Sequence, residues 1–179
     1  MFISTYRAIR SAIGRLLLEA HRRSILKTVH GGEGLYLNGK ILLVHGENLT
    51  LGRNVHIGHD ARLNCLGGIT IGDHTVISGH CTIYSYNHVF KHPTTLPVDT
   101  GIVRKPVHIG RYVWIGINVT IAPGTVIEDG AVIGMGTVVS GHVAANSIVV
   151  SPKYRVVGFR DCEFTSALAE RGMFYQRAA

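Results

Sequence analysis

Histidine gives this sequence most of its chemical options, because the chain contains 11 of them. An imidazole accepts or releases a proton near neutral pH, and it is also a frequent zinc ligand. His88 and His92 lie in an irregular segment that runs from Ser85 to Pro106. No serine or cysteine forms an evident nucleophile pair with a histidine. We therefore expect a histidine to act directly, either as a general base or as a metal ligand.

A six-residue repeat surrounds this segment and predicts the fold that positions it. Steps of six residues land on a branched aliphatic side chain each time, in three runs: Leu51, Ile57 and Leu63; Ile71, Ile77 and Ile83; Ile109, Ile115, Ile121, Ile127, Ile133 and Val139. A period of six fits neither a helix nor a single strand. It is typical of a solenoid with flat faces, each one hexapeptide long, in which the aliphatic side chain points inward and stacks on the next coil.

Two interruptions of the repeat have different meanings. Between Leu63 and Ile71 the step is longer by two residues, which we assign to Gly67 and Gly68. Between Ile83 and Ile109, about twenty residues lose the pattern altogether. A long loop that leaves a rigid scaffold is a usual place for function. The other histidines of the repeats are expected to point outward or to lie at corners, namely His56, His59, His74, His80, His108 and His142.

Composition limits the class of protein. The 179 residues suit one domain, and 46% apolar against 16% charged residues exclude a disordered chain. The 22 glycines do not form the triplets of collagen, so repeated tight turns explain them. Neither a signal peptide nor a span of about 20 apolar residues is visible. Cys65, Cys81 and Cys162 lack metal-type spacing and fit free thiols. We expect a cytoplasmic protein.

The two ends differ from the repeat. Residues 1–30 predict a basic amphipathic helix, from about residue 4 to 28, whose apolar face contains Tyr6, Ile9, Ile13, Leu16, Leu17 and Ala20. We expect this helix to pack on the solenoid and close its open end, and a contact with a membrane surface is the alternative. Nucleic acid is not expected despite the net charge of +7, since no aromatic stacking platform accompanies the charge. Residues 161–179 form a tail with a short helix predicted at 164–176.

The runs Ile71–Ile77 and Ile109–Gly116 resemble those of the hexapeptide-repeat acetyltransferases, in particular the galactoside, maltose and exopolysaccharide O-acetyltransferases. The resemblance covers roughly residues 50 to 160. It implies an all-β fold, a left-handed parallel β-helix at residues 31–160, with a loop at about 85–106. It also implies a homotrimer that transfers an acetyl group from acetyl-CoA to a hydroxyl of a sugar or polysaccharide precursor.

The resemblance further implies roles for single residues. His88 takes the place of the catalytic base, which faces a cleft between two subunits, and no metal is expected. Trp114 takes the place of a tryptophan at the acceptor pocket. The weaker acceptor candidates are Asn64, Tyr86, Asn87 and His92. Coenzyme contacts are expected from Gly116, Ile117, Gly134, Met135, Ser140 and Gly141, and from Lys153 and Arg155 toward its phosphates.

The chain departs from the family pattern in the donor groove. Met135 stands where an alanine is common, Gly141 where a lysine is common, and Lys153 alters the closing segment. Two other functions remain open. One is a zinc enzyme similar to the γ-class carbonic anhydrases, with ligands among His56, His59, His88 and His92. The other is a non-catalytic assembly subunit. The acceptor cannot be identified from the residues, although the basic helix favours a polysaccharide or a lipid-linked precursor.

Overall fold

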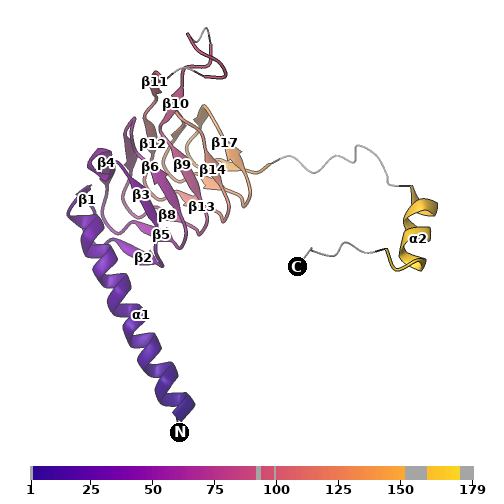
Figure 1. Ribbon diagram of the computed structural model, residues 1–179. Coiled ribbons are helices and arrows are strands. Elements are labelled where there is room, and N and C mark those ends of the chain that lie inside the picture. Colours follow the sequence, from indigo (N-terminus) through magenta and orange to yellow (C-terminus); the bar gives the residue numbers. More distant parts are fainter. Residues whose placement is uncertain (1, 92–93, 99, 152–160, 174–179) are drawn as a thin grey trace.

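A computed structural model describes residues 2–91, 94–98, 100–151 and 161–173 (Figure 1). The predicted parallel β-helix is confirmed, because three sheets of six, six and five strands stack parallel strands from successive coils. Each coil contributes one strand to each of the sheets that we name A, B and C, except the last coil, which has no described strand in sheet C. No helix among the described residues is long and apolar enough to span a bilayer.

The elements of the solenoid have the following bounds. Sheet A contains β1 (His30–Gly31), β4 (Leu49–Leu51), β7 (Ile69–Ile71), β12 (Val107–Ile109), β15 (Val126–Ile127) and β18 (His142–Val143). Sheet B contains β2 (Tyr36–Asn38), β5 (His56–Gly58), β8 (Val76–Ile77), β13 (Trp114–Ile115), β16 (Val132–Ile133) and β19 (Ile148–Val149). Sheet C contains β3 (Leu42–Val44), β6 (Arg62–Asn64), β9 (Thr82–Tyr84), β14 (Thr120–Ile121) and β17 (Val138–Val139). A short 3₁₀ turn, η1 (Gly46–Asn48), precedes β4.

The interior of the prism consists of the repeated aliphatic residues. All twelve positions of the three predicted runs are buried, with at most 3% of their surface exposed. They stack in register, as Ile77 shows by pairing with Ile57 on one side and Ile115 on the other. The first coil keeps the six-residue step at Leu37 and Leu43 but has Gly31 in the remaining place. The aliphatic column is therefore the core that fixes the register of every coil.

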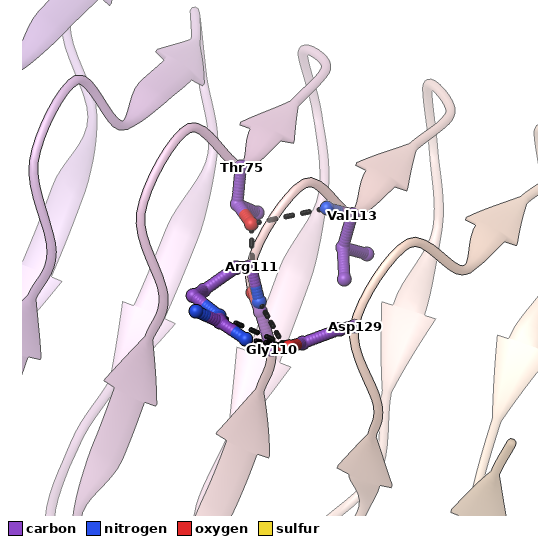
Figure 2. A network of polar contacts seen from close by, with 5 residues as sticks. All are labelled: Thr75, Gly110, Arg111, Val113 and Asp129. Carbon is purple, nitrogen blue, oxygen red and sulfur yellow. Dashed lines mark hydrogen bonds and ion pairs between the residues drawn. The ribbon is translucent and has the colours of Figure 1, made fainter. Parts of the chain in front are cut away.

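The corners turn through residues in the left-handed backbone region. Glycine, asparagine and aspartate are the residues most suited to this region, and all three occur there. Four bulkier residues also adopt a positive φ: His45, His74, His80 and Tyr112. Side chains fasten neighbouring coils at the corner between sheets A and B. Figure 2 shows the buried Thr75 hydroxyl, which donates to the Gly110 carbonyl and accepts from the Val113 N–H. Beside it, the Arg111 guanidinium donates to the Asp129 carboxylate at 3.0 and 2.6 Å.

The two predicted interruptions have the expected consequences. Gly67 and Gly68 lie in the turn between β6 and β7, so the register recovers with Leu51 opposite Ile71. The irregular segment forms a hairpin of β10 (Tyr86–His88) and β11 (Ile102–Arg104), which are antiparallel. The hairpin projects from the corner between sheets C and A (Figure 1).

The predicted packing of the N-terminal helix is wrong for most of its length. Helix α1 (Phe2–Leu26) extends away from the solenoid as a rod (Figure 1). Its predicted apolar face is exposed at Ile13 (51%), Leu16 (71%) and Leu17 (56%). Among the residues whose side chains are described, the last turns contact the first coil, through buried Ile25 and through His21, whose Nε2 accepts from the Ile41 N–H at 3.1 Å.

The C-terminal helix begins and ends earlier than predicted. Helix α2 spans Cys162–Glu170 rather than residues 164–176, because Asp161 caps it. The Asp161 carboxylate accepts from the Phe164 N–H at 2.9 Å, which satisfies one of the free donors of the first turn.

Candidate functional site

His88 is the last residue of β10, and its side chain is exposed on the hairpin. The strand pairs it with Ile102 of β11, and the Val89 N–H donates to the Gly101 carbonyl beyond it. The Asn87 amide oxygen accepts from the His88 backbone N–H at 2.9 Å. A pocket of about 270 Å³ lies here, lined by Asn87, His88, Val89, Phe90, Lys91, Val103 and Lys105. The imidazole is thus held on a paired strand and is open to a reactant.

A buried serine anchors the hairpin to the solenoid. The Ser85 hydroxyl donates to the Asn64 carbonyl at 3.0 Å and accepts from the Gly67 N–H at 2.9 Å. The Lys105 N–H donates to the Ser85 carbonyl at 2.8 Å, which closes the base of the hairpin. A Cβ at Gly67 would lie 1.8 Å from the Ser85 carbonyl oxygen, so only glycine fits there. This clamp was not predicted, because it joins residues from three separate stretches of sequence.

An aromatic row leads from sheet C to His88. Tyr84, Tyr86 and His88 alternate along the chain and so share one side of it. Their ring centroids are 5.8 and 6.0 Å apart. Tyr84 was absent from the predicted site, although its place two residues before Tyr86 was a usable signal. Rings with a polar tip offer both an apolar face and a hydroxyl to a ligand.

Asn64 lies beside this row with an unused acceptor. Residue 64 pairs with Tyr84 across sheet C. Its side-chain oxygen is buried and has no hydrogen-bond partner among the described residues. Such an atom is costly unless something donates to it. The structure therefore brings three predicted acceptor residues, Asn64, Tyr86 and Asn87, to the same corner as His88.

Trp114 does not join this group within one chain. It lies on β13 in sheet B, between Val76 and Val132, and 56% of it is exposed. The hairpin leaves the opposite corner of the prism, between sheets C and A. The predicted proximity of Trp114 and His88 is therefore not found in the single chain, since a strand on sheet B faces away from that corner.

The predicted coenzyme residues occupy two edges of sheet C. Gly116, Ile117, Gly134 and Met135 lie at the corner between sheets B and C, whereas Ser140 and Gly141 lie at the corner between sheets C and A. A Cβ at Gly116 would lie 2.7 Å from the Met135 backbone nitrogen, so coil stacking alone requires that glycine. Ile117 and Met135 are 37% and 75% exposed. Lys153, Arg155 and His92 lie outside the described residues.

The cysteines offer no nucleophile to this site. Cys65 and Cys81 are buried free thiols, as predicted. Burial raises the pKa of the Cys65 thiol to about 12 and also raises that of Cys81. Both thiols therefore stay protonated at neutral pH, and Cys162 lies in α2.

Of the histidines proposed for a zinc site, those that the structure describes do not converge. His56 lies on sheet B against the Tyr36 ring, at a centroid distance of 4.7 Å, and His88 lies on the hairpin. Within the described part of the chain, one group has the spacing to hold a metal ion: His59, Asp60 and His80. That group excludes His88, so the structure does not favour the zinc enzyme built on it.

A stack of hexapeptide coils with a hairpin inserted at one corner points to a class of protein, the hexapeptide-repeat transferases. A family model described as the bacterial transferase hexapeptide, with six repeats, matches residues 106–141. A crystal structure of this class, VCA0836 from Vibrio cholerae with acetyl coenzyme A, matches with a TM-score of 0.68 and 25% identity. It covers 85% of this chain and 87% of that one.

Two curated relatives narrow the class. The probable acetyltransferase Rv3034c of Mycobacterium tuberculosis is 32% identical over 156 residues, or 86% of this chain and 52% of the relative. The galactoside O-acetyltransferase of Escherichia coli is 29% identical over 138 residues, or 76% of this chain and 67% of the relative. This chain thus spans about half the length of the first and two thirds of the second. The chain is therefore similar to hexapeptide-repeat acetyltransferases over most of its own length.

Proposed function

We propose that this protein is an O-acetyltransferase, which moves an acetyl group from acetyl-CoA to a hydroxyl of a sugar or polysaccharide precursor. The observation that carries the proposal is the hairpin, which interrupts an otherwise regular solenoid and presents His88 next to Tyr86, at the corner where Asn64 also lies. The names of the relatives support the donor and the acceptor class, since one is a galactoside O-acetyltransferase and one structure holds acetyl coenzyme A.

In this mechanism His88 removes the proton of the acceptor hydroxyl as its oxygen attacks the thioester carbonyl. The new C–O bond forms, a tetrahedral oxyanion develops, and the C–S bond then breaks to release coenzyme A, whose sulfur takes up the proton. Backbone N–H groups are suited to stabilise the oxyanion. A positioned general base contributes about 10²- to 10⁴-fold to the rate. The transfer is direct, because the described site contains no competent thiol or serine nucleophile.

The proposed site requires a neighbouring subunit. His88 and Trp114 lie on different sides of one prism, so a shared cleft in a homotrimer is the arrangement that unites them. The hairpin carries exposed apolar side chains suited to such an interface, at Phe90 (58%), Ile102 (45%) and Val103 (39%). The coenzyme would lie along the neighbour's sheet C edge, with Arg155 and Lys153 assigned to its phosphates. Light scattering tests this: a trimer is expected, and a monomer would contradict it.

We further propose that α1 contacts an anionic membrane surface. Ile13, Leu16 and Leu17 are exposed, and the helix and its flank carry an excess of arginine and lysine. Co-sedimentation with vesicles of phosphatidylglycerol and phosphatidylcholine tests it. The variant Leu16→Gln with Leu17→Gln should lose most of the binding, and equal binding by both proteins would contradict the contact.

The activity is tested by an acetyl-CoA thiol-release screen against a panel of free sugars, oligosaccharides and sugar phosphates, with mass spectrometry of the products. A gain of one acetyl ester on an acceptor, with equimolar thiol, is the expected result. Absence of release with every acceptor would favour the non-catalytic subunit. The zinc enzyme is not favoured, and metal-dependent hydration of CO₂ without thiol release would be needed to restore it.

A further inference from the structure

A second cleft, larger than the pocket beside His88, lies on the outer face of sheet C near the corner with sheet B. Its volume is about 580 Å³, and it is lined by Lys40, Ile41, Leu42, Asp60, Arg62, His80 and Thr82. None of these residues belongs to the site described above. We propose that this cleft binds a phosphate group of the acceptor, so that the substrate is a sugar phosphate or a diphosphate-linked sugar. This inference rests on the proposed acetyl transfer.

The coil stack brings the basic side chains of the cleft together. Arg62 lies on β6 between Leu42 of β3 and Thr82 of β9, in register with both. Lys40 and His80 come from the corners of the coils before and after, as the Asp60 N–H donates to the Lys40 carbonyl and the His80 N–H to the His59 carbonyl. Neighbouring coils are about 4.8 Å apart, so the three groups span only about 10 Å.

The charge of the cleft favours an anion. Other arginines on the described coils are paired with carboxylates, as Arg53 is with Asp73 and Arg111 with Asp129. Among the described residues, no ion pair within 4.0 Å engages Lys40 or Arg62, so two cations face a single carboxylate, that of Asp60. A guanidinium fork matches two oxygens of a phosphate, and a Thr82 hydroxyl adds a donor.

Asp60 is already engaged by histidines. The His59 Nδ1 lies 3.0 Å from the Asp60 carboxylate, and the His80 Nδ1 lies 4.0 Å from it. The hydrogen bond from His59 lowers the pKa of Asp60, so the carboxylate stays ionised and bound to its own partner. Gly79 makes room for this arrangement, since a Cβ there would lie 3.0 Å from the His59 Nε2. The nearby charge of Arg62 also lowers the Asp60 pKa, but no ion pair within 4.0 Å among the described residues joins the two, so Lys40 and Arg62 remain available to a ligand.

The cleft adjoins the proposed acceptor site on the same surface. Arg62 precedes Asn64 by two residues on β6, and Thr82 precedes Tyr84 by two residues on β9, so each pair points to the same side of sheet C. Two residues along a strand cover about 7 Å. That separation suits a sugar ring at Asn64 and Tyr84 with its phosphate at Arg62, and it gives the acceptor class a physical basis.

Binding of inorganic pyrophosphate tests the inference directly. Titration calorimetry is run with EDTA present and with coenzyme A saturating the donor groove. Without the coenzyme, pyrophosphate could also bind where the coenzyme phosphates bind, and the two sites could not be told apart. Arg62→Gln and Lys40→Gln should each weaken pyrophosphate binding about tenfold or more, since each removes a charge-assisted hydrogen bond. Arg171→Gln, which removes the same charge from the end of α2, should change nothing.

Further arms distinguish the sources of the phosphate. UDP-glucose and farnesyl diphosphate in micelles carry the same diphosphate on a nucleotide and on a lipid, and the one that competes better with pyrophosphate identifies the carrier. Equal pyrophosphate affinity in wild type, Arg62→Gln and Lys40→Gln would overturn the inference. Pyrophosphate binding that appears only with added zinc and disappears in His59→Ala would also overturn the inference. If coenzyme A itself does not bind, the proposed acetyl transfer is contradicted. If coenzyme A binds but pyrophosphate does not, only the proposed phosphate site in the cleft is contradicted.

Discussion

The coil stack and the hairpin are built from similar residues but obey different constraints. In the stack, Ile115 is fully buried between the equivalent isoleucines of two neighbouring coils. In the hairpin, Ile102 is 45% exposed and pairs with His88 alone. From this difference we expect the repeat to determine stability and the break in the repeat to determine chemistry. Removing side chains from one region should therefore affect a different property than removing them from the other.

The largest stability difference is expected from one substitution made in both regions. Ile115→Ala should lower the free energy of unfolding by about 2–5 kcal/mol, because it leaves a cavity between two coils. Ile102→Ala, its matched control on the hairpin, should cost within about 0.5 kcal/mol. Urea unfolding of both variants measures the contrast. Equal losses of unfolding free energy in the two variants would contradict the contrast between stack and hairpin, since the hairpin would then belong to the core.

A smaller loss is expected at the corner that Figure 2 shows. Thr75→Val removes a buried hydroxyl that bonds Gly110 and Val113 of the next coil. The Val113 N–H is left without an acceptor, at a cost of about 1–3 kcal/mol. Thr70→Val, at an exposed position on β7, is the control and should be nearly neutral. An unchanged unfolding midpoint for Thr75→Val would mean that the corners do not depend on side-chain bonds.

Ser85 joins the two regions, so its loss should affect both properties. Ser85→Ala should cost about 0.5–1.5 kcal/mol of stability, because its hydroxyl bonds Asn64 and Gly67. It should also lower kcat by up to about 10²-fold, since the hairpin that carries His88 shifts. Ser85→Thr, which keeps the hydroxyl, should recover most of the turnover. A stability loss with unchanged kcat would show that the clamp does not position His88.

The smallest effect concerns pH and the exposed ion pairs of the stack. The hydrogen bond from Arg111 holds the pKa of Asp129 below its ordinary value. A lowered folded-state pKa stabilises the protein above the ordinary carboxyl pKa, and that contribution is lost as the pH falls through the folded value. The Tm of the wild type should decline slightly below about pH 4. Asp129→Asn should show a shallower decline, and identical Tm profiles would exclude a contribution from this pair.

The repeat could be predicted because each coil repeats the same local rule at Ile57, Ile77 or Ile115. The break that contains His88 was visible for the same reason. The clamp at Ser85 and the cleft at Arg62 could not be predicted, because both depend on which residues stack across coils about twenty residues apart. The packing of helix α1 was mispredicted because an apolar face at Leu16 and Leu17 indicates that the face is suited to burial, but it does not identify the surface that buries it.

The central claim is that His88 is the base of a direct acetyl transfer. It is tested by thiol release from acetyl-CoA with the best acceptor of the screen, measured for wild type, His88→Ala and His108→Ala, the last being an exposed histidine on β12. Acetyl-CoA binding and Tm are measured on the same proteins. We predict a loss of kcat of about 10²- to 10⁴-fold for His88→Ala alone, with unchanged Tm and coenzyme binding. Near-wild-type turnover by His88→Ala would contradict the assignment.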